Sequence, residues 1–150
     1  MICLILGIGF NKISAEKKKM AADKLQVNNN VEIRNIEKAE ISGAKKETEG
    51  IKVTFAFKTS YSPPIGEILL EGELVAVEDQ KVAEEALKQW KKNKTLSKEL
   101  LREVMDSILA RATIEAVVIS REISLPPPIP FPKVSDRQDK PVQPNQPYIG

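Results

Sequence analysis

The sequence predicts an α+β fold: a four-stranded antiparallel sheet, then two helices of which the second is long, then a Pro-rich extended tail. Apolar and polar residues alternate with a period of two through much of the first half of the chain, which is typical of β-strands. Beyond Asp79, apolar residues recur every three or four positions, as they do in amphipathic helices. Eight of the ten prolines then lie between Pro126 and Pro147. At 150 residues, one folded domain is the expected number.

Three strands are expected before residue 62. Met1–Phe10 is almost wholly apolar, which predicts a buried first strand that continues through Gly9–Lys19; a wrongly assigned start codon, leaving a fortuitous apolar end, is the alternative. Val27–Ile41 alternates but slips phase at Ile36, which predicts a β-bulge, and the asparagines at 28–30 favour a turn. Ile51–Tyr61 alternates without a break, so its odd-numbered positions face one way.

A fourth strand is expected at Glu67–Val77, after a turn around Pro63 and Pro64. Apolar residues lie on both of its faces: Ile68, Leu70 and Leu74 on one, and Leu69, Val75 and Val77, with Glu71 and Glu73, on the other. Because two helices cover only one face of a sheet, the second set would be exposed in a monomer. We therefore expect a homo-oligomer, a dimer or tetramer, held through Leu69, Val75 and Val77 or through the helix layer.

Two helices are expected in the second half of the chain. Asp79 is a good N-cap for the first, whose apolar stripe ends at Trp90, and Ser97 is a good N-cap for the second. From Leu101 onward, the apolar residues of the second helix keep helical spacing over about six turns. The β-branched residues of Thr113–Ile119 would also suit a strand, but the stripe stays in phase, which favours one long helix.

The segment Leu125–Pro132 is expected to be extended polyproline II. Its apolar residues Leu125, Ile129 and Phe131 are expected to pack against the chain's own domain; a ligand for SH3 or WW modules is the alternative. Beyond Lys133 the chain is polar and rich in proline, which predicts disorder. The expected organisation is one domain over residues 1–134 and a disordered Pro-rich tail over residues 135–150.

Composition excludes several kinds of site. The chain has no histidine and a single cysteine, Cys3, so it lacks the commonest general base, the commonest metal ligand and any internal disulfide. A net charge of +2 does not indicate a nucleic-acid partner. The apolar start of the chain is about half as long as a membrane helix, so no membrane insertion is expected. We expect a cytoplasmic protein with no metal, cofactor or catalytic residue.

Three further patterns have both a functional and a structural interpretation. Gly7-Ile8-Gly9 is similar to the start of a dinucleotide-binding loop, but Lys12 stands where a third glycine would, which favours a glycine-softened strand. Lysine clusters at 17–19, 45–46 and 91–92 lack an aromatic platform, which favours a solvated surface. Glu71 and Glu73 share a strand face, as a carboxylate-based enzyme would need, but a half-exposed strand explains them as well.

Two local sequences and the order of the elements resemble the SecB export-chaperone superfamily. Arg111-Ala112-Thr113-Ile114, late in the long helix, is similar to that family's Arg-Gly-Thr-Phe. Pro128-Ile129-Pro130-Phe131 is similar to its Pro-Val-Asn-Phe ending. Strands, a short helix, a long helix and an extended segment ending in an aromatic follow in the same order. The resemblance covers roughly residues 8 to 134, and the whole pattern, with its LPPPIP run, resembles archaeal members.

The resemblance implies a non-enzymatic chaperone, linked to protein export, that binds unfolded or extended polypeptide in apolar grooves and assembles as a dimer of dimers. An adaptor of the same fold for one dedicated partner is the alternative, and a small carboxylate-based enzyme is the third hypothesis. We expect bound polypeptide near Tyr61, Trp90 and Phe131, which end the best strand, the first helical stripe and the proline segment. The alternative is that these aromatic side chains pack at the ends of the core and have only a structural role.

Overall fold

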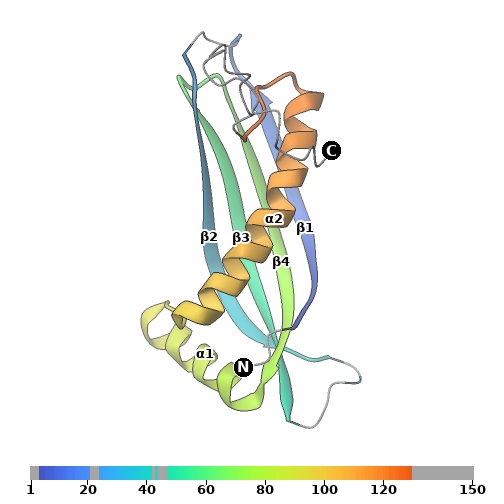
Figure 1. Cartoon of the computed structure of the whole chain (residues 1–150), viewed down its shortest axis with the longest axis vertical. Coiled ribbons are helices and arrows are strands. Elements are labelled where there is room, and N and C mark those ends of the chain that lie inside the picture. Colours follow the sequence, from blue (N-terminus) through green and yellow to red (C-terminus); the bar gives the residue numbers. More distant parts are fainter. Residues whose placement is uncertain (1–3, 21–23, 42, 44–46, 130–150) are drawn as a thin grey trace, which may run out of the picture.

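The computed structural model describes residues 4–20, 24–41, 43 and 47–129. In chain order its elements are β1 (Leu4–Lys17), β2 (Gln26–Ala39), β3 (Thr48–Ser62), β4 (Gly66–Asp79), α1 (Gln80–Asn93) and α2 (Lys98–Glu122). The expected α+β fold, with four strands followed by a short and a long helix, is confirmed (Figure 1). The first three residues, Phe131 and the predicted tail over residues 135–150 lie outside the described residues.

The four strands form one antiparallel sheet in the order β1-β4-β3-β2, so β3 and β4 are central and β1 and β2 are the edges (Figure 1). The register of β2 on β3 shifts between Ile33 and Asn35, which confirms the β-bulge predicted from the phase slip. The asparagines at 28–30 lie inside β2, so the turn expected there is wrong. Their pairing with residues 58–60 of β3 outweighs the weak local preference of asparagine for turns.

Both helices pack on one face of the sheet, which we call the helix face; the opposite face is the open face. Figure 1 shows α2 crossing the sheet diagonally, from the β2 side at its start to the β1 side at its end. All 25 of its residues are helical, so Thr113–Ile119 is helix, as the in-phase stripe favoured. Its buried residues recur every four positions, and this repeat drifts around a helix of 3.6 residues per turn, as a diagonal crossing requires.

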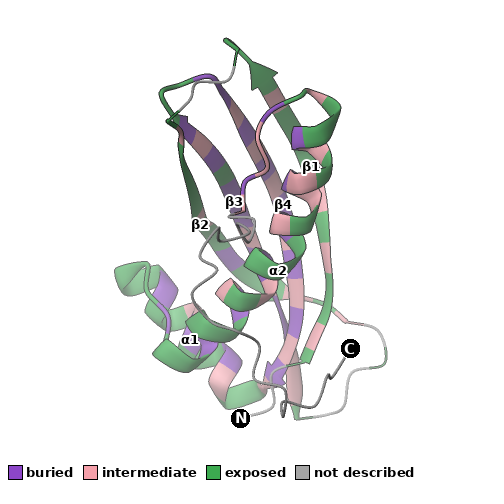
Figure 2. Cartoon of the chain, turned by 45° about the horizontal axis from the view of Figure 1, so that its top comes forward, coloured by how far each residue is buried: buried purple, intermediate pink, exposed green. Residues whose placement is uncertain are grey.

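The core lies between the helices and the two central strands (Figure 2). The odd-numbered positions of Ile51–Tyr61 are buried, and so are Ile68, Leu70 and Leu74 of β4, as the alternation predicted. Ser97 caps α2 by accepting a hydrogen bond from the backbone N–H of Leu100 at 3.4 Å. Asp79 occupies the N-cap position of α1 but makes no side-chain capping bond there.

The first strand is an exposed edge, so its expected burial is wrong. Leu4, Leu6 and Ile13 are 56%, 48% and 51% exposed, although the strand itself is confirmed. Only β4 pairs with β1 among the described strands, and two register shifts, after Ile5 and after Phe10, interrupt that pairing. An apolar run alone does not distinguish a central strand from an edge strand, because that depends on which partners arrive later in the chain.

The exit segment, residues 125–129, leads away from α2 and crosses the helix face toward β2. Leu125 is buried over β4, where its side chain would contact any Cβ placed on Gly66. The Tyr61 hydroxyl of β3 donates to the carbonyl of Pro126, and the Asn29 side-chain amide of β2 donates to the carbonyl of Pro128 at 2.7 Å. The expected packing of the proline segment against its own domain is therefore confirmed as far as the described residues extend.

Candidate functional site

An apolar hollow of about 430 Å³ lies on the helix face where β2, the end of α1 and the start of α2 meet. We call it the Trp90 hollow. It is lined by Val31, Glu32, Ile33, Trp90, Lys94, Thr95, Leu96, Leu101 and Met105. Only the start of α2 lines the hollow, because α2 begins on the β2 side of the sheet and runs diagonally away from it (Figure 1).

The corner between α1 and α2 fixes the indole of Trp90. α1 ends at Lys94, which has the left-handed φ of 55° and donates its backbone N–H to the carbonyl of Trp90 at 2.9 Å. The ammonium group of Lys94 also lies 5.4 Å from the centre of the Trp90 ring, within cation–π range. Leu96, in the connection to α2, is buried beside them. Trp90 is thus 7% exposed, yet it forms part of the wall of the hollow.

A stripe of apolar side chains extends the hollow along α2. Leu101, Met105 and Leu109 are four residues apart, so they lie on one side of the helix. Leu101 is 38% exposed and Leu109 is 36% exposed, so part of each side chain is open to solvent. These side chains offer a ligand a continuous apolar contact along the first half of α2.

The walls of the hollow suit apolar ligands. Its two charged lining residues, Glu32 and Lys94, are both exposed to solvent. The indole Nε1 of Trp90 has no hydrogen-bond acceptor among the described residues. Such a site gains free energy mainly by removing apolar surface from water, which requires no fixed pattern of hydrogen bonds.

The structure places Tyr61 and Trp90 in different hollows. Tyr61 is 4% exposed, and burial raises the pKa of its phenol above the ordinary value of 10.0. It lines a hollow with residues 26–28 of β2, at the level of the exit segment. Phe131 lies outside the described residues. Polypeptide binding by Tyr61, Trp90 and Phe131 therefore stays a prediction.

The other apolar residues of the Trp90 hollow could not be identified as site residues from the sequence. The sequence places Val31 and Ile33 in a strand and Leu101 in a helical stripe, and the structure confirms each of these assignments. Their meeting depends on the crossing angle of α2, which no local pattern encodes. The sequence of α2 does indicate an exposed apolar surface, because the helix has more apolar residues than one buried stripe can hold.

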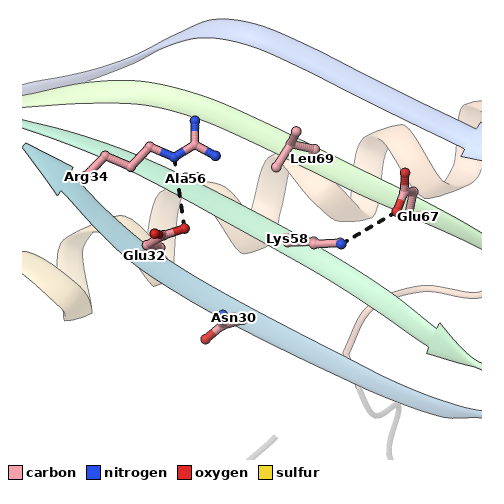
Figure 3. Close-up of a pocket in the computed structure, with 7 residues that line it drawn as sticks. All are labelled: Asn30, Glu32, Arg34, Ala56, Lys58, Glu67 and Leu69. Atoms are coloured by element: carbon pink, nitrogen blue, oxygen red, sulfur yellow. Dashed lines mark ion pairs between the residues drawn. The ribbon is translucent and has the colours of Figure 1, made fainter.

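The open face carries Leu69, Val75 and Val77, as expected, and all three are half-buried. Leu69 lies among charges, in a pocket of about 300 Å³ that Figure 3 shows, lined also by Asn30, Glu32, Arg34, Ala56, Lys58 and Glu67. Val75 and Val77 lie near the other end of β4, opposite Gly7 and Leu4 of β1. The three residues thus form two separate sites, and their role as an oligomer interface stays a prediction.

Ion pairs run across the strands of the open face. Arg34 pairs with Glu71 across the small side chain of Ala56, and Lys52 pairs with Glu37 at 2.8 Å and with Glu73 at 3.8 Å. Glu71 and Glu73, the carboxylates considered for an enzyme, are therefore each bound to a cation on an open surface. This arrangement supports the half-exposed-strand interpretation of the two residues.

The remaining patterns are structural where the structure describes them. Gly7 and Gly9 lie within β1, so they form a glycine-softened strand and no dinucleotide-binding loop. Lysines 17–19 and 91–92 are exposed, and lysines 45–46 lie outside the described residues. Within the described ranges, no helix has the length and apolar character to cross a membrane. No three metal-ligating side chains gather there either.

Comparison with known proteins finds a likeness in fold. The chain is similar to the SecB-like chaperone Rv1957 of Mycobacterium tuberculosis, solved in complex with a ChAD peptide from the Rv1956 HigA1 antitoxin. The TM-score is 0.51 at 11% sequence identity, and the match covers 93% of each chain. No protein-family model and no curated protein sequence matches this chain. The likeness to archaeal members stays a prediction, whereas the sheet and helices described above form a SecB-like α+β fold.

Proposed function

We propose that this protein is a non-enzymatic, SecB-like chaperone of the cytoplasm that holds unfolded or extended polypeptide in the Trp90 hollow. The observation that carries the proposal is the meeting of apolar side chains from β2 and α2, most of them half-buried, around Trp90. The likeness in fold to a chaperone that binds a peptide supports it. The single cysteine and the absence of histidine from the sequence agree with polypeptide binding, which needs neither disulfides nor proton transfer.

The hollow and the apolar stripe suit short apolar segments. Burial of one Leu- or Phe-sized side chain contributes about 1.5–3 kcal/mol, and micromolar affinity corresponds to about 8 kcal/mol. Several side chains must therefore be buried together, after the cost of ordering the client. The stripe Leu101, Met105 and Leu109 provides the length that such multiple contacts need.

The test compares two glutamate substitutions in α2. Leu101→Glu places a charge in the wall of the hollow, whereas Ala110→Glu places the same charge at an exposed site of α2 outside it. Fluorescence anisotropy measures binding of labelled, reduced and carboxymethylated α-lactalbumin, a permanently unfolded protein. Leu101→Glu should weaken binding about 10-fold or more, because lost apolar burial of 1.4 kcal/mol corresponds to that factor. Equal affinities for the two variants would place the client site elsewhere.

An adaptor for one dedicated partner is the second candidate. The observation that favours it is that the neighbour of similar fold was solved with a peptide from one named antitoxin. Purification of the tagged chain from its native host separates the two functions. Many unrelated unfolded proteins among the captured partners would support the chaperone, and secretory precursors among them would support the proposed link to export. A single stoichiometric partner would support the adaptor.

A homo-oligomer, a dimer or a tetramer, is part of the proposal. Val75 and Val77 on the open face lie beside the exposed Leu4 of β1, and on α2 Ile114 and Val118 are 62% and 51% exposed. Soluble monomers rarely expose large contiguous apolar patches, so a second copy is the expected cover for at least one of these two surfaces. Light scattering that gives the monomer mass at micromolar concentration would contradict this part of the proposal.

A further inference from the structure

The exit segment approaches the Trp90 hollow from the β4 side. Its contacts begin at Tyr61 of β3, through Pro126, and continue to Asn29 of β2, through Pro128. Asn29 pairs with Thr59, which lies two residues before Tyr61 along β3. The segment therefore crosses two strands and moves toward the pair Val31–Phe57, which is the next pair on the same face.

The anchor on β2 is well defined. The Asn29 carbonyl oxygen accepts a hydrogen bond from the Thr59 hydroxyl at 2.7 Å, which leaves its NH₂ group free to donate to Pro128. Thr59 itself is fully buried. The chain thus reaches Pro128 at a fixed point on the edge of the sheet, on the same face as the hollow.

The distances along β2 match the next residues of the chain. Residues two apart in a strand lie about 7 Å apart, so Val31 is about 7 Å and Ile33 about 14 Å beyond Asn29. An extended or polyproline chain advances about 3.1–3.4 Å per residue, so residue 131 reaches about 10 Å beyond Pro128. A chain that followed β2 after Pro128 would therefore bring residue 131 between Val31 and Ile33, two residues of the hollow.

The sequence at these positions suits an apolar hollow. Phe131 lies between Pro130 and Pro132, and Val134 follows one residue beyond Lys133. Each proline lacks a backbone N–H, so fewer donors lose their hydrogen bonds to water when the segment is buried. Proline also restricts the free chain, which lowers the entropy lost on docking.

We propose that residues 130–134 of the same chain dock in the Trp90 hollow, with Phe131 as the anchor, and that a client polypeptide must displace them. The competition with clients depends on the chaperone function proposed above; the docking does not. A short tether gives an effective concentration of about 1 mM, so a segment with an intrinsic dissociation constant of about 100 μM weakens client binding about 10-fold.

The chain carries its own reporter, because Trp90 is the single tryptophan and lines the hollow. Phe131→Ser in the full chain should shift the Trp90 emission to longer wavelength and tighten binding of carboxymethylated α-lactalbumin about 10-fold. Phe131→Leu should retain most of the docking. The matched control, Tyr148→Ser, removes an aromatic farther along the same chain and should change neither quantity. Circular dichroism verifies that each variant is folded.

A synthetic peptide of residues 128–141 provides a second measurement on the unmodified chain. It should compete with labelled α-lactalbumin, and a peptide with serine at position 131 should not. If neither variant nor peptide changes Trp90 emission or client affinity, the docking is refuted while client binding stands. If α-lactalbumin binds no form of the chain but Phe131→Ser still shifts the emission, the docking stands and the chaperone function is refuted.

Discussion

Gly72 of β4 lies where the sheet tolerates no side chain, so Gly72→Ala is a sharp test of the sheet arrangement. A Cβ at this position would lie 2.1 Å from the carbonyl oxygen of Gly9 in β1 and 3.1 Å from the Cα of Phe10. Both contacts are to backbone atoms, which cannot relieve a clash by changing rotamer as a side chain can. The absence of a side chain also lets the rings of Phe10 and Phe55 meet edge to face above Gly72, with centroids 6.2 Å apart.

The expected loss of stability follows from these contacts. Overpacking of this kind costs about 1–3 kcal/mol, and loss of an edge-to-face aromatic pair costs about 0.5–1.5 kcal/mol. Alanine recovers about 0.5–1 kcal/mol, because glycine loses more backbone entropy on folding. We therefore expect Gly72→Ala to lower the free energy of unfolding by roughly 1–3 kcal/mol, which lowers the melting temperature by about 2–4 °C per kcal/mol for a chain of this size.

Gly9→Ala is the matched control, because a Cβ on Gly9 meets no atom within 4 Å. Both substitutions add one methyl group to paired strands of the same sheet, so the difference between them isolates the clash. Urea unfolding followed by circular dichroism gives both free energies, and Gly9→Ala should be neutral or slightly stabilising. Equal stability of the two variants would refute the pairing of β1 with β4 in this register.

Three further outcomes are expected. Burial raises the pKa of Tyr61, and the hydrogen bonds that Lys38 and Lys52 donate to Glu49 and Glu37 raise the pKa values of these two lysines, so each group favours its protonated form in the folded chain. The stability that these groups contribute should thus be fully present below pH 10 and be lost as the pH rises through the raised pKa values. The melting temperature should therefore fall between pH 9 and pH 11, and it should fall less in Tyr61→Phe than in the unmodified chain. A stop codon after Val134 should leave the melting temperature nearly unchanged, and a loss of several degrees would show that residues 135–150 dock on the domain. Val77→Lys should dissociate an oligomer held through the open face, and an unchanged mass by light scattering would exclude that interface.

Most of the fold could be predicted because the signals are local. In β3 the alternation from Ile51 to Tyr61 predicts both the strand and its buried face, and the structure confirms both. The phase slip near Ile36 correctly predicts the bulge, since one extra residue reverses the side chains that follow. Thr113–Ile119 is helical despite its β-branched composition, because packing of the apolar stripe outweighs intrinsic propensity.

Features that depend on partners distant in the sequence could not be predicted. The apolar start of the chain suggests burial, yet β1 is an edge, because β3 and β2 occupy the other side of β4. Asn29 lies in a run that favours a turn, yet it pairs in β2 and anchors Pro128, which lies 99 residues away in the chain. Trp90 was found as a candidate from its place at the end of a stripe, whereas Val31 and Leu101 required the crossing angle of α2.

The chemistry of the Trp90 hollow favours broad selection of clients over recognition of one sequence. Strong discrimination requires buried polar groups that a wrong ligand leaves unpaired, whereas an apolar pocket distinguishes one methylene by only about 1–3 kcal/mol. Glu32 and Lys94 are exposed, so water satisfies them whichever ligand is bound. The Trp90 indole N–H is buried and has no acceptor among the described residues, so it offers a ligand no accessible, fixed hydrogen-bond donor. The hollow would therefore select for extended, apolar chain, and the same property makes the chain's own Pro-Phe-Pro sequence a suitable competitor.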